Sequence, residues 1–332
     1  MMYNASAVKM QRMAGLARAL IFSEKRGAPV AQLSGWPLAR LIHAGFLVQA
    51  GKEQLVKLRK KTGYSFANCK KALEKFDDLN EAEVWLHEQA QKEGWSKVSK
   101  LQGRKTKEGL IGLLKEGNSA VMVEVNCETD FVARNAKFQH LVQQVAIGTM
   151  QYQQRTRGQL STYAKCFLKS NELSQLRTEP DGSLLSDQLA LAIGKLGENM
   201  AIKRAAWVSV PEKLFIGSYV HGTLPEGNPW LSNMMFGKYG ALVICSPPEQ
   251  CQKLNLAELG WRLGQHVVGM APLSVGSLED EPGDDTETKM LAQPFLLEPT
   301  ISLGQYIQPT GVSVLDFVRF ECGEDTESAE SE

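Results

Sequence analysis

The chain has 332 residues, of which 43% are hydrophobic and 22% charged, and its formal net charge is zero. This is enough apolar material for two or three packed units, and no apolar run reaches the ~18 residues that would span a bilayer. Residues 1–50 carry a net charge of +5, so the rest of the chain carries −5. An acidic body argues against a nucleic-acid surface and favours a protein partner.

The N-terminal 50 residues predict a cleavable mitochondrial transit peptide, and hence a protein of the mitochondrial matrix. They hold six basic residues and one acidic residue, and their apolar residues have the spacing of an amphipathic helix. A secretory signal would need a continuous apolar segment, which is absent. A disordered N-terminal extension is the alternative.

The cysteines and histidines predict no metal site. The six cysteines form no C-x-x-C pair and the five histidines are dispersed, so no zinc-binding spacing is present. Reduced, structural thiols are expected. The cysteines are Cys69, Cys127, Cys166, Cys245, Cys251 and Cys322.

Residues 51–93 predict three short helices in a compact bundle of the ubiquitin-associated type. The first is expected to end at Thr62-Gly63, Ser65 to cap the second and Asn80 to cap the third. Residues 94–108 are rich in charge and predict a linker.

The next segment, residues 109–210, predicts the first half of an α+β core. A hairpin is expected from residues 110–114 and 121–125, with Glu116-Gly117-Asn118 as its turn. Along the second strand, Met122, Glu124 and Asn126 lie opposite the apolar face. A helix capped by Asn135 follows.

The same order recurs in residues 211–322, which predict a second, similar half. Strands at 216–221 and 239–244 are expected to pair, and a helix follows over residues 256–267. Chance similarity of short elements is the alternative to a true repeat.

Other elements complete the predicted core. Ser186 is expected to cap a helix that ends at Gly197, before a strand over residues 200–208. Residues 273–289 predict an acidic, mobile loop. A short helix at 303–307, a last strand at 312–320 and an acidic tail at 323–332 follow.

No motif of covalent catalysis is present, so the chain is not expected to be an enzyme. The Gly194-Lys195 pair lacks the other residues of a phosphate-binding loop. Glu124 and Glu128 could be imagined as an acid/base pair, but their positions indicate solvent-facing or capping roles. No cofactor is expected.

The segment Thr129-Asp130-Phe131-Val132 lies between a strand and a helix, where a large aromatic is unusual. Phe131 either packs into its own core, as such residues usually do, or is displayed for insertion into a partner. The residues alone leave both possibilities open.

Several motifs, in order along the chain, resemble those of the translation elongation factor Ts family, mitochondrial type. The resemblance covers nearly everything after residue 50. The matching segments are Leu58-Arg59-Lys60-Lys61-Thr62-Gly63, Cys69-Lys70-Lys71-Ala72-Leu73, Glu124-Val125-Asn126-Cys127-Glu128-Thr129-Asp130-Phe131-Val132-Ala133, Lys195-Leu196-Gly197-Glu198-Asn199, Gly217-Ser218-Tyr219-Val220-His221-Gly222, Gln293-Pro294-Phe295-Leu296-Leu297-Glu298-Pro299 and Phe317-Val318-Arg319-Phe320-Glu321.

The resemblance implies a guanine-nucleotide exchange factor for mitochondrial elongation factor Tu that itself binds no nucleotide, nucleic acid or membrane. It implies that Asp130 and Phe131 insert beside the magnesium site of that partner. Further partner contacts are implied for Val132, Leu196, His221, Arg59, Lys70 and Phe66.

Two departures from the bacterial pattern stand out. Phe66-Ala67 replaces two methionines in the bundle, and only residues 273–289 stand where bacterial members insert a helical hairpin. Two rival functions remain, a ubiquitin-binding adaptor acting through residues 51–93 and an enzyme for a small molecule.

Overall fold

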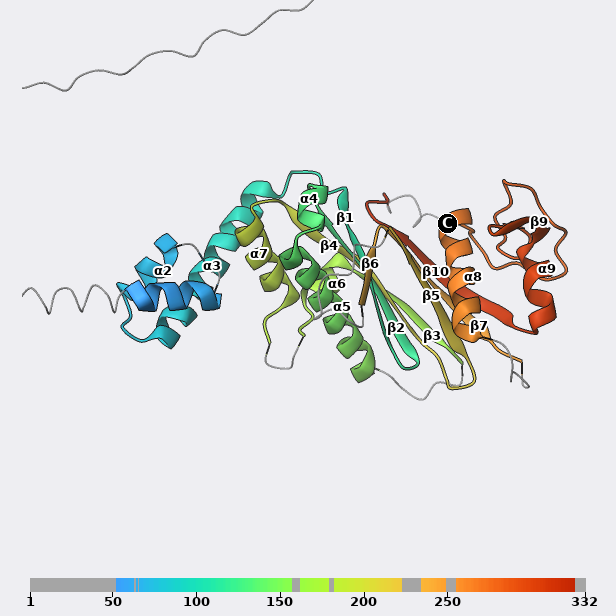
Figure 1. Cartoon of the computed structure of the whole chain (residues 1–332), viewed down its shortest axis with the longest axis horizontal. Helices are drawn as coiled ribbons and strands as arrows, with labels where there is room; N and C mark the ends of the chain where they lie inside the picture. The colour runs from blue at the N-terminus through green and yellow to red at the C-terminus, as the bar shows by residue number, and fades with distance from the viewer. Residues whose placement is uncertain are drawn as a thin grey trace, which may run out of the picture. The chain divides into compact units, whose positions relative to one another are not determined.

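A computed structural model describes most of the chain after residue 51 (Figure 1). It divides into two compact units, Met1–Lys57 and Leu58–Glu332. The predictions for residues 1–50, for Gly63 and Ser65, and for most of the acidic tail lie outside the described residues. Within them, no helix is both long and apolar enough to cross a membrane. The described residues are 52–62, 64, 66–156, 162–178, 182–222, 234–248 and 255–325.

The predicted helices of the bundle are present, but the last one is longer than expected. Residues 52–62 are helical, and α2 (Phe66–Leu73) packs on α3 (Leu79–Leu101). Asp78, not Asn80, caps α3, because its carboxylate accepts hydrogen bonds from the backbone N–H groups of Asn80 (3.0 Å) and Glu81 (3.1 Å). The helix continues through residues 94–101, so part of the segment expected to be a linker is helical.

The end of α3 packs closely against α7 (Leu185–Leu196). A Cβ at Gly94 would lie 2.3 Å from the carbonyl oxygen of Ala190, so only glycine fits there. The Lys97 ammonium donates to the carbonyl oxygen of Gly194 at 2.7 Å. The bundle's last helix is therefore attached to the core by direct backbone proximity.

The first half of the core is a five-stranded antiparallel sheet in the order β3-β4-β2-β1-β6. The predicted hairpin is its centre, with Leu110 opposite Val125. The helix α5 (Ala136–Thr156) covers one face, and the side chain of Asn135 accepts a hydrogen bond in its first turn, from the N–H of Lys137. The strands are β1 (Glu108–Glu116), β2 (Ser119–Cys127), β3 (Ala164–Lys169), β4 (Met200–Ser209) and β6 (Met234–Gly237), and α6 spans Ser170–Ser174.

The second half is a three-stranded sheet in the order β10-β7-β5. As predicted, the strands β5 (Phe215–His221) and β7 (Tyr239–Ser246) pair, with Ile216 opposite Ile244. The helix α8 (Leu256–Met270) covers the outer face. The smaller elements are α9 (Leu303–Ile307), η2 (Gln308–Thr310), β8 (Pro294–Phe295), β9 (Glu298–Ser302) and β10 (Ser313–Glu321).

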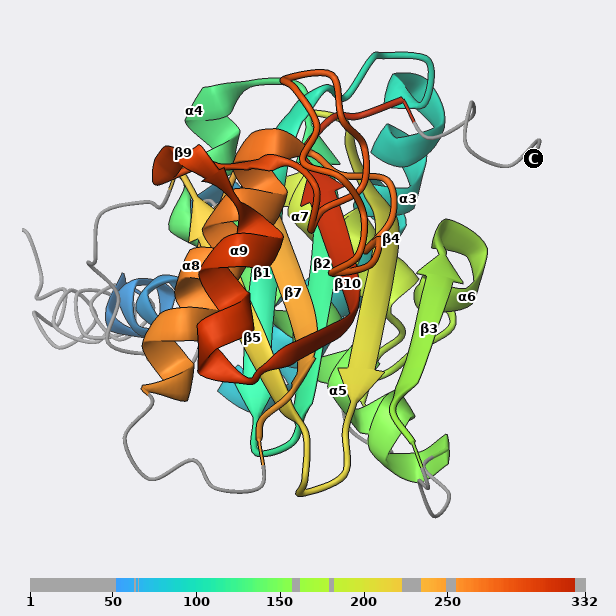
Figure 2. The same cartoon turned by 90° about the vertical axis from the view of Figure 1, so that its right-hand side faces the viewer.

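The two sheets lie face to face, and helices cover their outer faces (Figure 2). Along β7, Leu242 and Ile244 point to the cluster between the sheets, whereas Ala241 and Val243 point to the cluster under α8. This alternation is the period-two pattern of a strand that is buried on both faces. The core of the chain is thus built as helix, sheet, sheet and helix.

The second sheet changes the surroundings of β2. Met122, Glu124 and Asn126 were predicted to lie opposite the apolar face, and they do, but that face is buried as well. The expected solvent-facing role of Glu124 is wrong. The sequence of one hairpin does not reveal that another sheet covers its polar face.

Two further details differ from expectation. The N-cap of α7 is Leu184, so Ser186 lies within the first turn instead of capping it, while Gly197 ends the helix with a left-handed φ of 81° as predicted. The acidic segment 273–289 has a defined conformation. Its backbone is held by bonds such as Leu273 N–H to the carbonyl of Thr288 at 2.8 Å.

Candidate protein-binding site

Phe131 lies on the short helix α4 (Asp130–Ala133) and is 81% exposed. No other large apolar side chain among the described residues is more exposed. Its neighbours Val132 and Ala133 are buried in the core under α5. The short helix is therefore anchored on one side and displays Phe131 on the other, so the alternative in which Phe131 packs into its own core is wrong.

Two glutamates and a threonine brace α4 against the loop that follows α7. The Thr129 hydroxyl donates to the carboxylate of Glu198 at 2.9 Å, and its oxygen accepts from the N–H of Val132 at 3.4 Å. The Glu128 carboxylate accepts from the backbone N–H of Asn199 at 2.6 Å. We call Glu128, Thr129 and α4 the platform. Sequence reasoning found the Glu198 motif but not its contact with Thr129, because the two are far apart in the chain.

Asp130 precedes Phe131 on α4, and Leu196 packs against the same core cluster as Val132. Asp130 forms a surface ion pair with Arg134 at 3.2 Å, and its side chain is 46% exposed. Exposed pairs of this kind contribute only ~0.3–0.5 kcal/mol, so the carboxylate is easily recruited by another donor. Leu196 is the last residue of α7, is half-buried against the same core and precedes Glu198 by two residues.

Val132 was also expected to contact the partner, but its side chain is only 8% exposed. It packs in the core beneath the platform. Its structural role is to hold α4 in place, and Phe131 and Asp130 are the side chains of α4 that face outward.

His221 ends β5 and is exposed next to two tyrosines. Its Nδ1 lies 3.0 Å from the Tyr219 hydroxyl, and its ring centre lies 6.1 Å from that of Tyr239. The His221 carbonyl accepts from the N–H of Lys238, whose ammonium contacts Glu108 at the start of β1. Since β1 starts opposite the end of β2, these contacts bring His221 to the same end of the sheets as the platform.

The predicted contact residues of the bundle form a separate cluster. The guanidinium of Arg59 stacks 3.9 Å from the ring centre of Phe66, which is 47% exposed. Lys70 follows Phe66 by one helical turn and is highly exposed. These three side chains share one face, and within the described residues no contact joins them to Phe131.

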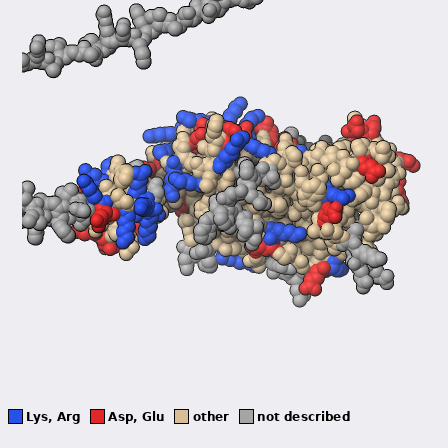
Figure 3. All heavy atoms as spheres, in the orientation of Figure 1, with Lys and Arg blue, Asp and Glu red and all other residues tan. Residues whose placement is uncertain are grey.

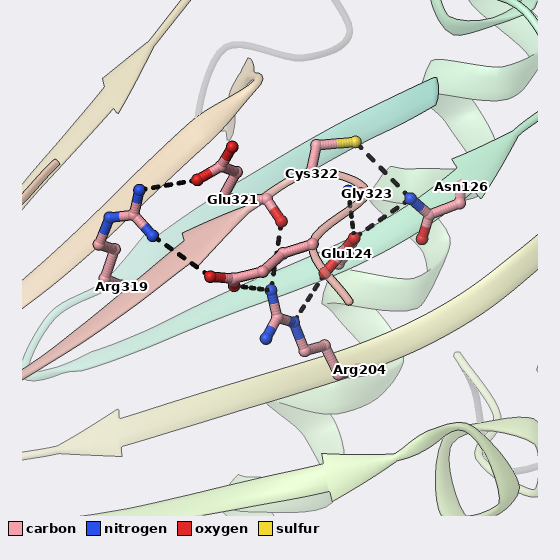
Figure 4. A network of polar contacts seen from close by, with 8 residues as sticks. Glu124, Asn126, Arg204, Arg319, Glu321, Cys322 and Gly323 are labelled. Carbon is pink, nitrogen blue, oxygen red and sulfur yellow. Dashed lines mark hydrogen bonds and ion pairs between the residues drawn. The ribbon is translucent and has the colours of Figure 1, made fainter. Parts of the chain in front are cut away.

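A buried ionic network lies behind the platform, on the face of β2 that meets the second sheet (Figure 4). The fully buried Glu124 carboxylate accepts from Arg204 Nε at 2.7 Å and from the N–H of Gly323 at 2.8 Å. The Asn126 amide donates to the same carboxylate at 3.1 Å. Arg204 also contacts the Glu324 carboxylate at 3.0 Å. The network ties the end of β10 to the strand that leads into the platform.

Glycine is required at position 323. Its φ is +82°, and a Cβ there would lie 2.2 Å from the carbonyl oxygen of Lys107. The chain can therefore turn closely over the start of β1 and donate its N–H to Glu124. Residues of the C-terminus thus help to build the region around the platform, although the sequence separates them by about 200 positions.

The two cysteines near the platform have thiols with raised pKa values. Burial, assisted by the charge of Glu198, raises the pKa of the Cys127 thiol to about 12, and burial raises the pKa of Cys322 to about 12. Such thiols are protonated and unreactive at neutral pH. In the described part of the chain, no group of three His, Cys, Asp or Glu residues could hold a metal ion.

Aromatic side chains are enriched at protein–protein interfaces, so an exposed phenylalanine on a braced helix, beside a half-exposed carboxylate, is typical of a protein-binding surface. Comparison with known proteins specifies the class. The family model described as elongation factor TS matches residues 128–281, and the model for the N-terminal part of mitochondrial elongation factor Ts matches residues 39–96.

Individual relatives agree. The chain is 69% identical to mitochondrial elongation factor Ts of Mus musculus over 286 residues, which are 85% of this chain and 87% of the relative. Identity to the Homo sapiens protein is 68%, with 85% and 86% covered, and to the Xenopus laevis protein 64%, with 91% and 96% covered. The chain belongs to the elongation factor Ts family, of the mitochondrial type, and is a translation elongation factor.

Proposed function

We propose that this chain is a guanine-nucleotide exchange factor for mitochondrial elongation factor Tu, and that Phe131 acts as a wedge beside the magnesium and phosphate site of that partner. The observation that carries the proposal is the 81% exposure of Phe131 on the braced platform. Single exposed apolar side chains are common on protein surfaces, so the proposal also depends on the hydrogen bonds that fix α4 and on the half-exposed Asp130 beside Phe131.

Exchange is a coupling between two ligands of one partner. If the factor and the nucleotide each favour a different conformation of the site, each lowers the affinity of the other by the same factor. A ~10⁴-fold shift requires about 5.5 kcal/mol of differential binding, whereas burying one phenylalanine contributes about 1.5–3 kcal/mol. Phe131 alone is therefore not sufficient.

The remaining free energy is assigned to the other exposed groups of the site. Asp130, Leu196 and His221 act from the same end of the core as Phe131. The cluster of Arg59, Phe66 and Lys70 on the bundle provides a second contact. Excess GDP with magnesium is expected to weaken the complex, as reciprocity requires.

The proposal includes the setting of the activity. The basic segment of residues 1–50 supports import into the mitochondrial matrix. The chain promotes GDP release without a covalent step, and it acts without a cofactor, metal or nucleotide of its own. Its partner is a protein, and no contact with nucleic acid or a membrane is required.

The test is release of labelled GDP from mitochondrial elongation factor Tu in a stopped-flow instrument. Phe131→Ala is expected to slow release about ten- to hundredfold at equal concentration, because 1.5–3 kcal/mol of contact is lost. Complex formation should remain measurable, and the free energy of unfolding should not change, since the side chain is exposed.

The matched control is Phe167→Ala, which removes another exposed phenylalanine from the edge strand β3. It should leave GDP release unchanged. If Phe131→Ala releases GDP as fast as the unaltered chain, the wedge role fails. If the unaltered chain itself does not accelerate release, the exchange function fails.

The rival function, a ubiquitin-binding adaptor, depends on the bundle alone. The last helix of that bundle continues to Leu101 and packs on α7, so the bundle is not an independent module. Parallel pull-downs with ubiquitin and with elongation factor Tu separate the two functions, and only the second is expected to retain the chain.

A further inference from the structure

Three exposed lysines from three different helices border the platform. Lys97 comes from α3, Lys137 from the first turn of α5 and Lys195 from the end of α7. The Lys97 ammonium donates to the carbonyl of Gly194 at 2.7 Å, so it lies next to the residue that precedes Lys195. Figure 3 shows Lys and Arg side chains, interspersed with Asp and Glu, over the region where α3, α4 and β1 meet.

The chain connects two of these lysines to the platform. Lys195 is followed directly by Leu196, and three residues later Glu198 accepts the hydrogen bond of Thr129 in the platform. Lys137 follows Phe131 by six residues, and α5 packs on both α4 and α7. Lys137 and Lys195 therefore come from the two helices next to α4, and the Lys195 ammonium also lies 5.1 Å from the ring centre of Tyr64.

The described residues provide no carboxylate partner for Lys97, Lys137 or Lys195. The neighbouring cations differ, because Arg104 contacts Glu128 at 3.4 Å and Arg134 contacts Asp130 at 3.2 Å. Burial lowers the pKa of Lys195, and the positive charge of Lys137 lowers it further. Two like charges are thus held near each other, an arrangement that an external anion would stabilise.

We propose that Lys97, Lys137 and Lys195 form a cationic rim that receives an acidic surface of the protein partner and guides Phe131 into its site. The inference rests on the exchange function proposed above and specifies how the partner is captured. Complementary charge at an interface accelerates the encounter of two proteins, and added salt removes this effect. The rim thus acts on the association rate, whereas the wedge acts on the bound nucleotide.

An acidic protein surface fits this rim better than a nucleic acid does. Nucleic-acid affinity depends on how many phosphates Lys and Arg neutralise, and the rim supplies three cations, fewer than the ~6–10 contacts of a protein whose binding is strongly salt-dependent. Carboxylates lie within the same surface, since Asp130 is half-exposed beside Phe131. They would repel a phosphate backbone but tolerate a partner surface of mixed charge.

The experiment compares two double variants. Lys137→Gln with Lys195→Gln removes two rim charges and leaves the Lys97 bond to Gly194 intact. Lys203→Gln with Lys213→Gln removes two exposed lysines on β4 and in the segment before β5, as a control of equal charge change. Association with mitochondrial elongation factor Tu is measured by stopped flow over a range of salt concentrations, and urea unfolding verifies that each variant is folded.

We expect the rim variant to associate about threefold to tenfold more slowly at low salt and to lose most of its salt dependence. Its GDP release rate at saturating concentration should equal that of the unaltered chain, and the control variant should match the unaltered chain in both assays. Equal association rates and equal salt slopes for the rim variant and the unaltered chain would overturn the cationic rim.

Fluorescence anisotropy with single-stranded RNA tests the other class of ligand. RNA binding that the rim variant loses, while its association with elongation factor Tu is unchanged, would assign these lysines to nucleic acid and overturn the proposal. A failure of the exchange function has a different signature. In that case the unaltered chain gives no acceleration of GDP release at any salt concentration.

Discussion

The two halves of the core share an architecture but differ in how helix and sheet meet. In the first half, α5 packs on its sheet through bulky side chains such as Phe138 and Val145. In the second half, α8 meets β5 through glycines, and a Cβ at Gly260 would lie 2.6 Å from the Cα of Gly217. Each half thus places a helix on a sheet, but the first uses large side chains at the contact and the second uses glycines.

The two halves also support their exposed side chains differently. The first half uses hydrogen bonds at the exit of its central strand to support α4, and Phe131 projects from that support. The second half presses its helix directly onto the strand that ends at His221. Phe131 of the first half and His221 of the second half thus reach the same end of the core from supports of different kinds.

The two halves are joined by contacts in both directions. The strand β6 lies in the second half of the sequence but pairs with β1 in the first sheet. In the other direction, the N–H of Gly323 donates to Glu124 of β2, next to Arg204. A substitution that breaks these contacts should therefore destabilise both sheets.

The largest stability effect is expected for Arg204→Ala, which removes the partner of a fully buried carboxylate. Leaving a buried charge without its partner costs about 3–5 kcal/mol. Urea unfolding followed by circular dichroism should show this loss in a single transition, because the network joins both halves. The neighbouring Lys203→Ala, at an exposed position, should change little. A loss below ~1 kcal/mol for Arg204→Ala would mean that the junction does not hold the halves together.

A second prediction distinguishes the halves by their response to acid. Burial lowers the pKa of His266 on α8 to about 4. A group whose pKa is lower in the folded state stabilises the fold above its unfolded pKa of ~6.5. That stability is lost as the pH falls from about 6.5 to about 4, since the unfolded chain then binds the proton more tightly.

The expected loss from His266 is ~3 kcal/mol across this window. His266→Gln should flatten this part of the stability profile, measured by urea unfolding at several pH values. His140→Gln, which replaces an exposed histidine of α5, is the matched substitution in the first half. An unchanged profile in His266→Gln would show that this histidine is not the source of the acid sensitivity.

A third prediction addresses the glycine contact itself. Gly260→Ala places a Cβ 2.6 Å from the backbone of Gly217 and should cost about 2 kcal/mol, because the backbone has to move apart. Gly148→Ala in α5 places a Cβ no closer than 3.4 Å to its neighbours. It should be neutral or stabilise by about 0.5–1 kcal/mol, as alanine favours helix. Similar costs in thermal unfolding of the two variants would remove the distinction between the halves.

Local elements of this fold follow from sequence, whereas contacts between distant segments do not. The hairpin of β1 and β2 and the helix end at Gly197 were predicted from alternation and turn chemistry. The cap of α3 was misplaced because Asp78 and Asn80 are equally good caps two residues apart. The pairing of β6 with β1 joins segments more than 100 residues apart, and no local pattern signals it.

The candidate site shows the same division. Phe131 is noticeable as an aromatic between strand and helix, but the residues alone favour the buried role that is usual at such a position, and only the family resemblance points to the exposed one. The burial of Glu124 depends on the second sheet and on Gly323. A strand with a glutamate on its polar face has the same sequence pattern whether water or another sheet covers that face.

The smallest stability effect, and the sharpest comparison of function, comes from two helix caps. Thr129→Ala removes the cap of α4 and its bond to Glu198, and Asn255→Ala removes the cap of α8, where Asn255 accepts from the N–H of Glu258 at 3.2 Å. Each should cost ~1 kcal/mol in urea unfolding. Only Thr129→Ala should slow GDP release from elongation factor Tu, by severalfold at equal protein concentration, because only α4 positions Phe131. If both variants slowed release equally, the effect would come from lost stability, and the platform would have no positioning role of its own.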